Sequence, residues 1–210
     1  AAGKDISHGS IRLNSVLKER TGNVSDNGKK IIELASVFFN NANYEVLLAV
    51  SELNEFELVE TLEELQQKQL LIEEVDIDKS GPVYKFYNLQ IRNYVYSQMS
   101  MLRKRIFHKR IALYLEEKLK RGTESKDVYE QILYHYTNAD EKFKMLDYTI
   151  QLAEKYFFLQ YEMFPELNSY YARGDLDLRE SRSQIAMYLD KIKEVLDVLL
   201  GQNPTDKRLD

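Results

Sequence analysis

The sequence of 210 residues contains no cysteine, which excludes disulfide bonds and thiolate metal sites. A chain without cysteine suits a reducing compartment, so we expect a cytoplasmic protein. Tryptophan is also absent, and only three prolines and eight glycines interrupt the chain. So few helix-breaking residues predict long helices and few irregular loops.

Long apolar runs are missing as well. No segment approaches the roughly 18 consecutive apolar residues of a membrane-spanning helix, so we expect no membrane partner. The start, "AAGKDISHGS", lacks the apolar core and cleavage site of a signal peptide. The end, "NPTDKRLD", indicates a turn and a new helix with Thr205 as its N-cap. We therefore expect a fragment of a longer protein, with its last domain truncated at the C-terminus.

The residue patterns of catalysis and metal binding are also lacking. The three histidines, at positions 8, 108 and 135, are far apart, so no metal site is predicted. The segment "GNVSDNGKK" resembles a phosphate-binding loop, but five residues separate its glycines and Lys30 stands where Ser or Thr is required. We expect it to be a loop at a helix start. Neither a nucleophile elbow nor a Ser-His-Asp signature occurs, so no catalytic residue, no cofactor and no enzyme activity are predicted for this chain.

Three helices are predicted in the first third of the chain, after residues 1–24, which are polar and are expected to form a connector or a short helix. Ser25 or Asp26 is expected to cap a helix through "GKKIIELASVFF", and Asn43 one through "YEVLLAVSE". Asn54 and Glu57 form the capping-box pattern of a third helix, "EFELVETLEELQQKQ". The apolar face of this third helix is expected to consist of Phe56, Val59, Leu62 and Leu65.

A β-hairpin is predicted next. The segments "LLIEEVDI" and "VYKFYNL" have strand patterns, and "DKSGP" between them is a turn signal. Three helices followed by a hairpin is the order of a winged helix. We therefore expect a winged-helix domain at residues 25–100.

From Leu89 onward the pattern is helical again. Ile91, Val95 and Met99 form one apolar stripe, and the helix that follows is expected to end at Gly122. Further helices are predicted over residues 126–140, 141–160, 161–175 and 178–201. Successive helices with short joints indicate stacked antiparallel hairpins like those of tetratricopeptide repeats, over residues 101–210. The predicted fold class is mainly α.

The negative charge around the third predicted helix argues against DNA binding by that helix. Residues 43–78 contain one base, Lys68, against eleven acids: Glu45, Glu52, Glu55, Glu57, Glu60, Glu63, Glu64, Glu73, Glu74, Asp76 and Asp78. Because DNA phosphates would repel such a helix, direct DNA binding is not expected.

A basic cluster follows in the predicted helix after residue 100. It comprises Arg103, Lys104, Arg105, His108, Lys109 and Arg110. A charge run of this kind is usually a solvated face whose aliphatic stems pack on neighbours. The alternative is a docking patch for an acidic partner, such as the chain's own acidic third helix or a nucleotide.

Two stretches resemble a known family. "IIELASVFFNNANYEVLLAVSELNEFELVETLEELQQKQLLIEE" resembles the segment that follows the nucleotide-binding core in signal-transduction NTPases of the STAND class. "FYNLQIRNYVYSQMSMLRKRIFHKRIALYLEE" is similar to the next family stretch, F-x-H, then I-R-x-x-V-Y, then R-x-x-x-H-x-x-I-A-x-x-L-E. The matching residues are Phe86, Ile91, Arg92, Val95, Tyr96, His108, Ile111, Ala112, Leu115 and Glu116.

The resemblance covers about residues 10–165 and implies a function. In such proteins the winged helix packs on the NTPase core, and tetratricopeptide-like helices follow as the sensor. Bacterial members include multidomain transcription regulators. One position departs from the pattern: Asn88 stands where many members have a histidine that touches the phosphates of ADP. Asn88 can keep a weaker form of that contact, or it can simply cap the next helix.

We therefore expect a non-catalytic regulatory and sensor fragment of a STAND-type signalling ATPase. ADP or ATP would bind only to the parent's NTPase core, the intramolecular partner, and a protein or small-molecule effector would bind the helical repeats. A freestanding helical scaffold for protein partners is the first alternative. A winged-helix regulator that binds DNA is the second.

Overall fold

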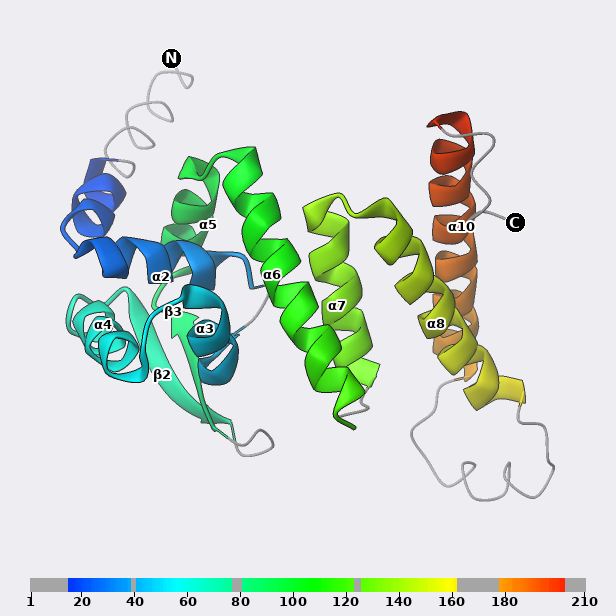
Figure 1. Ribbon diagram of the computed structural model, residues 1–210, viewed down its shortest axis with the longest axis horizontal. Coiled ribbons are helices and arrows are strands. Elements are labelled where there is room, and N and C mark those ends of the chain that lie inside the picture. Colours follow the sequence, from blue (N-terminus) through cyan, green and yellow to red (C-terminus); the bar gives the residue numbers. More distant parts are fainter. Residues whose placement is uncertain (1–14, 39–40, 77–80, 123–125, 162–177, 203–210) are drawn as a thin grey trace, which may run out of the picture. The chain divides into compact units, whose positions relative to one another are not determined.

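The structure, a computed structural model, describes residues 15–38, 41–76, 81–122, 126–161 and 178–202. These segments are mainly helical and contain one three-stranded antiparallel sheet (Figure 1), so the predicted mainly-α class is confirmed. The chain divides into two compact units, Ala1–Tyr114 and Leu115–Asp210, here called the N-terminal and C-terminal units. The sequence-based domain boundary, between residues 100 and 101, falls in the turn before helix α6 (Met101–Lys120) and stays a prediction.

None of the helices in the described ranges has the length and apolar character needed to cross a membrane.

The three helices predicted for the first third of the chain begin at their predicted caps. The hydroxyl of Ser25 accepts the Gly28 N–H at 2.9 Å at the start of α2 (Asp26–Ser36). Asn43 caps α3 (Tyr44–Ser51). Asn54 and Glu57 form the reciprocal capping box of α4 (Glu55–Gln67). These caps could be found from the sequence because each one satisfies a free backbone N–H with a local side chain.

The hairpin forms as predicted, and a third strand joins it. β2 (Leu71–Asp76) pairs antiparallel with β3 (Gly81–Phe86), with Leu71 opposite Phe86. The two-residue strand β1 (Ala42–Asn43) pairs with the other edge of β3, so the strand order is β1-β3-β2. β1 was not predicted, because two residues are too few to show an alternating pattern.

The predicted apolar face of α4 is half wrong. Leu62 and Leu65 are buried, but Phe56 is 84% exposed and Val59 is also exposed. Leu58 and Thr61 face the core in their place. The buried positions, 58, 61, 62 and 65, are three, one and three residues apart, which keeps them on one face of a helix with 3.6 residues per turn. Residues that are always three apart, as in the predicted face, are displaced progressively around the helix.

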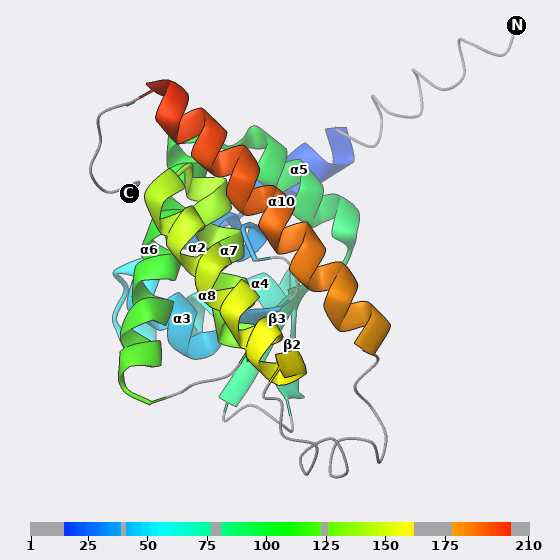
Figure 2. The ribbon, with the colours of Figure 1, turned by 90° about the vertical axis from the view of Figure 1, so that its right-hand side faces the viewer.

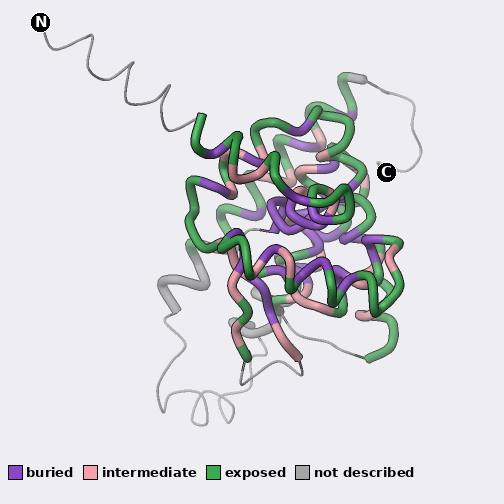
Figure 3. The backbone as a smooth tube through the Cα atoms, turned by 90° about the vertical axis from the view of Figure 1, so that its left-hand side faces the viewer, coloured by how far each residue is buried: buried purple, intermediate pink, exposed green. Residues whose placement is uncertain are grey.

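Helix α5 (Leu89–Gln98) packs in the N-terminal unit through the predicted stripe, because Ile91, Val95 and Met99 are all buried. The Arg92 guanidinium donates two hydrogen bonds to the Phe38 carbonyl, at 3.0 and 2.6 Å. That carbonyl follows the end of α2, where backbone oxygens have no helical partner. Buried and exposed stretches alternate along the backbone, as amphipathic helices require (Figure 3).

The C-terminal unit is built from α7 (Lys126–Ala139), α8 (Lys142–Tyr161) and α10 (Leu178–Gln202), with α8 packed against both others. α8 and α10 run side by side (Figure 2), and Leu146 of α8 forms a core with Val195 and Leu199 of α10. Gly122 ends α6 with a φ of +99°, as predicted. The predicted Thr205 cap and most of the helix predicted over 161–175 lie outside the described residues.

Candidate functional site

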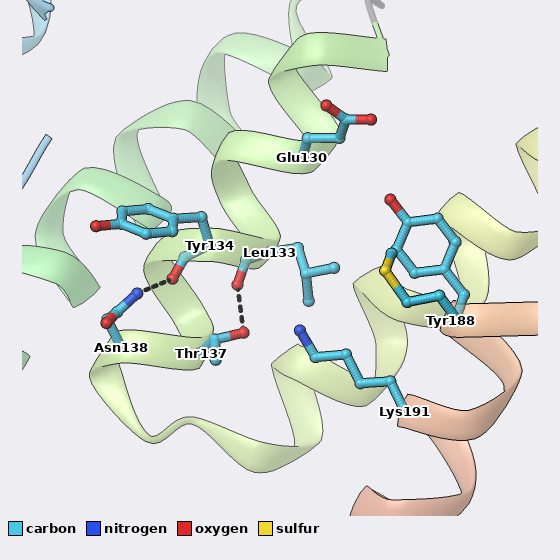
Figure 4. Close-up of a pocket in the computed structure, with 8 residues that line it drawn as sticks. Glu130, Leu133, Tyr134, Thr137, Asn138, Tyr188 and Lys191 are labelled. Atoms are coloured by element: carbon cyan, nitrogen blue, oxygen red, sulfur yellow. Dashed lines mark hydrogen bonds between the residues drawn. The ribbon is translucent and has the colours of Figure 1, made fainter. Parts of the chain in front are cut away.

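A groove with a volume of about 360 Å³ lies within the C-terminal unit, between α7 and α10 (Figure 4). This volume is in the range of ligand sites. Its lining mixes apolar, aromatic, amide and charged side chains: Glu130, Leu133, Tyr134, Thr137 and Asn138 of α7, and Met187, Tyr188 and Lys191 of α10.

Helical spacing and local hydrogen bonds position the α7 side of the groove. Its five lining residues recur every three or four positions, and therefore share one face of α7. Thr137 donates its hydroxyl hydrogen to the Leu133 carbonyl at 2.7 Å, and Asn138 donates its amide to the Tyr134 carbonyl at 2.8 Å. Each bond spans four residues and holds its side chain against the helix.

Lys191 supplies a positive charge to the groove. Its side chain extends from α10 toward Leu133 and Thr137 (Figure 4). Burial lowers the pKa of the Lys191 ammonium, and the neighbouring Glu194 offsets part of that effect. Within the described ranges no carboxylate oxygen lies within 4 Å of its Nζ. An anionic ligand group in the groove would therefore relieve the cost of burying this charge.

None of the groove residues was singled out from the sequence. The spacing on α7 shows that they share a face. It does not show that α10, which begins after residues 162–177, lies opposite. The groove is a product of tertiary packing.

Asn88 lies on the surface at the junction of β3 and α5. It has extended backbone angles, φ −144° and ψ 132°, and its Oδ1 accepts the Gln90 N–H at 2.7 Å. The predicted helix cap is confirmed. The cap uses Oδ1 alone, so the Nδ2 group could still donate to a phosphate. That contact stays a prediction.

We expect the Asn88→Ala variant to lower the free energy of unfolding by about 1 kcal/mol, because α5 loses its N-cap. Asn88→Asp should stay within about 0.3 kcal/mol of the native chain, since Asp caps equally well. Urea unfolding followed by circular dichroism would measure both. Equal stability of all three chains would contradict a stabilising cap.

The basic cluster on α6 is largely engaged within the N-terminal unit. Arg103 Nη2 lies 2.5 Å from Glu33 Oε2 of α2, and Arg110 Nη1 lies 2.6 Å from Oε1 of Glu52, the residue after α3. The ammonium of Lys104 lies 4.4 Å from the Tyr96 ring centroid. These contacts tie α6 to α2, to the end of α3 and to α5, and not to the acidic helix α4.

His108, another member of the cluster, is completely buried. It therefore lies beneath the basic surface and not on it. Its Nε2 is 3.4 Å from the Tyr96 hydroxyl oxygen. Arg105 and Lys109 are exposed, and docking of an acidic partner on this helix stays a prediction.

A search of the described residues finds no group of three or more His, Asp or Glu side chains that could hold a metal ion.

No protein-family model, curated protein or solved structure matches this chain.

Proposed function

We propose that this chain is a non-catalytic regulatory module of a cytoplasmic STAND-type signalling ATPase. The N-terminal unit is a winged helix that contacts the NTPase core of the parent protein. The C-terminal unit is the beginning of a tetratricopeptide-like array that binds a protein or small-molecule effector. Effector binding shifts a two-state equilibrium away from the resting, ADP-bound state.

The observation that carries this proposal is the groove between α7 and α10. It combines a volume of about 360 Å³ with buried aromatic and apolar side chains and a half-buried ammonium. Sites that bind small ligands or peptide side chains have this composition. Because it lies in the unit expected to act as the sensor, it offers a place for an effector.

Topology supports the winged-helix proposal. The elements follow in the order α2, β1, α3, α4, β2, β3, and the short strand β1 completes a sheet of order β1-β3-β2. A winged helix has this order, with its wing between the last two strands.

Several residues that match the family motif have structural roles in the N-terminal unit. Ile91, His108 and Ile111 are buried, and Arg92 bonds to the end of α2. Burial or bonding at these motif positions supports the family proposal.

The DNA-binding alternative finds no support on α4. Its exposed side carries Glu55, Glu60 and Glu63, and Lys68 lies 2.7 Å from Glu64. A phosphate backbone would meet carboxylates along the whole helix. A freestanding scaffold would also use the groove to bind its partners, so the groove does not distinguish it from the first proposal. A nucleotide-release experiment on the parent protein does.

If an effector binds in the groove, peptides selected from a random library for binding to the native chain should owe part of their affinity to Lys191. Lys191→Glu should weaken binding of the selected peptides at least about tenfold, because a half-buried favourable charge is replaced by an unfavourable one. Lys193→Glu makes the same charge change at an exposed position of α10 and should leave affinity within about twofold, as rim charges do. Fluorescence anisotropy would measure both, and equal effects would contradict binding in the groove.

Nucleotide retention in the full-length parent separates the regulatory module from the scaffold. If residue 88 contacts ADP, Asn88→Ala should release it faster, and Asn88→His, which restores the family residue, should hold it longer. Asn88→Asp keeps the cap but loses the Nδ2 donor, and should behave like the alanine variant. Unchanged release in all three variants would favour the scaffold.

A further inference from the structure

Two helices of the N-terminal unit expose faces that the core does not use. On α4 the exposed face contains Phe56, Val59, Glu60, Glu63 and Gln67. On α6 it contains Leu102, Arg105, Ile106, Lys109 and Leu113. Both sets follow the same spacing, with steps of three, one, three and four residues, so each forms one continuous helix face.

The two faces match in length and in the spacing of their residues. Each spans eleven residue steps, from 56 to 67 and from 102 to 113, which is about 16 Å at 1.5 Å per residue. Each presents apolar side chains to solvent: Phe56 is 84% exposed, and Leu102 is 68% exposed. Single exposed apolar residues are ordinary, whereas a contiguous exposed apolar row bordered by charge is typical of interaction surfaces.

Their charges are opposite. The α4 face has two carboxylates, Glu60 and Glu63, and in the described part of the chain no cation lies within 4 Å of either. The α6 face has two cations, Arg105 and Lys109, which also make contacts within the chain and remain exposed. Juxtaposed, the faces would bury apolar side chains between helices and place acids against bases.

The two faces cannot meet within one chain. The opposite side of α6 is held on its own unit by Arg103 with Glu33 and by Arg110 with Glu52, and Phe107 and Ile111 are buried there. The opposite side of α4 is buried through Leu58 and Leu62. Both exposed faces therefore point away from the unit that carries them.

We propose that a second copy of this chain docks here, with the α6 face of one copy on the α4 face of the next. The contact is head-to-tail, so the assembly keeps one unused α4 face at one end and one unused α6 face at the other. A single pair of helix faces is smaller than a standard interface of about 1,600 Å². The association is therefore weak and reversible, and we expect it at chain concentrations of about 10–500 µM.

Sedimentation velocity of the full 210-residue chain tests this directly. The native chain should show a concentration-dependent increase in mass that weakens as salt is raised. Glu60→Lys with Glu63→Lys should weaken association at least about tenfold, and Arg105→Glu with Lys109→Glu should do the same. Asp190→Lys with Asp197→Lys, which makes the same charge change on exposed positions of α10, should leave association within about twofold.

Mixing the two face variants gives the decisive result. The α4 variant keeps an intact α6 face, and the α6 variant keeps an intact α4 face, so the mixture should form a 1:1 complex that grows no further. Circular dichroism of each variant alone checks that it is folded. A native chain that stays monomeric at 500 µM would overturn the proposal and leave the α4 face to a basic helix of another protein. Loss of association in the α6 variant alone, or a mixture without a complex, would overturn it as well.

Discussion

Lowering the pH from 7 to 4 should lower the free energy of unfolding of the N-terminal unit by about 3 kcal/mol through His108 alone. Burial, and then the nearby Arg92 charge, lower the pKa of this imidazole to about 4. The unfolded chain has an ordinary histidine pKa of about 6.5. Between these two values the unfolded state binds a proton that the folded state does not. Stability is therefore constant above pH 6.5 and falls as the pH drops toward 4.

The His108→Gln variant isolates this contribution, because glutamine is neutral at every pH. Urea unfolding of both chains at several pH values between 7 and 4 should show a steeper loss in the native chain. His8 and His135 are present in both chains, so their contributions cancel in the comparison. NMR titration of the native imidazole provides a second measurement that does not depend on the variant folding. An imidazole that titrates near pH 6.5, or equal slopes in both chains, would rule out the prediction.

The Glu64→Gln variant should lower the free energy of unfolding at pH 7 by about 2–3 kcal/mol. Glu64 Oε1 accepts the Ser25 N–H at 2.9 Å and lies 2.7 Å from Lys68 Nζ. Its Oε2 accepts the Ser25 hydroxyl at 2.5 Å. Burial raises the pKa of this carboxyl, but these bonds outweigh it and lower the pKa to about 2. The carboxylate therefore links α4 to the cap of α2.

The neighbouring residue provides the control for Glu64. Glu63 is exposed on the same helix, and Glu63→Gln should change stability by less than about 0.5 kcal/mol. The stabilisation by Glu64 is complete above pH 4.5 and is lost as the pH falls through 2. The difference between the native chain and Glu64→Gln should therefore close toward pH 2. A difference that persists at pH 2 would show that the variant disturbs packing instead of charge.

The loop before α2 resembles a phosphate-binding loop in sequence but forms the start of a helix. In this segment, "GNVSDNGKK", the prediction of a helix start is confirmed by Ser25. The structure adds a reason for its second glycine. A Cβ on Gly28 would lie 3.1 Å from Ser25 Oγ and 3.2 Å from Glu64 Oε2. The glycine lets the Glu64 carboxylate approach the helix start, which no pattern of the loop alone could indicate.

The sequence by itself determined the features that depend on neighbours along the chain. The helix caps at Ser25, Asn43, Asn54 and Asn88, the hairpin and the buried stripe of α5 all follow from interactions within a few residues. Short-range sterics and hydrogen bonds act in the same way wherever the segment lies in the fold.

Only the tertiary structure decided which faces meet. In the packed structure Phe56 is exposed, and Arg103 pairs with Glu33. Lys191 and Thr137 line the same groove from different helices. A helix of this amphipathic kind has several faces of similar composition, and the face that is buried depends on partners distant in sequence. The energy that selects it comes from apolar area removed from water by those partners, so it becomes visible only once the helices are packed.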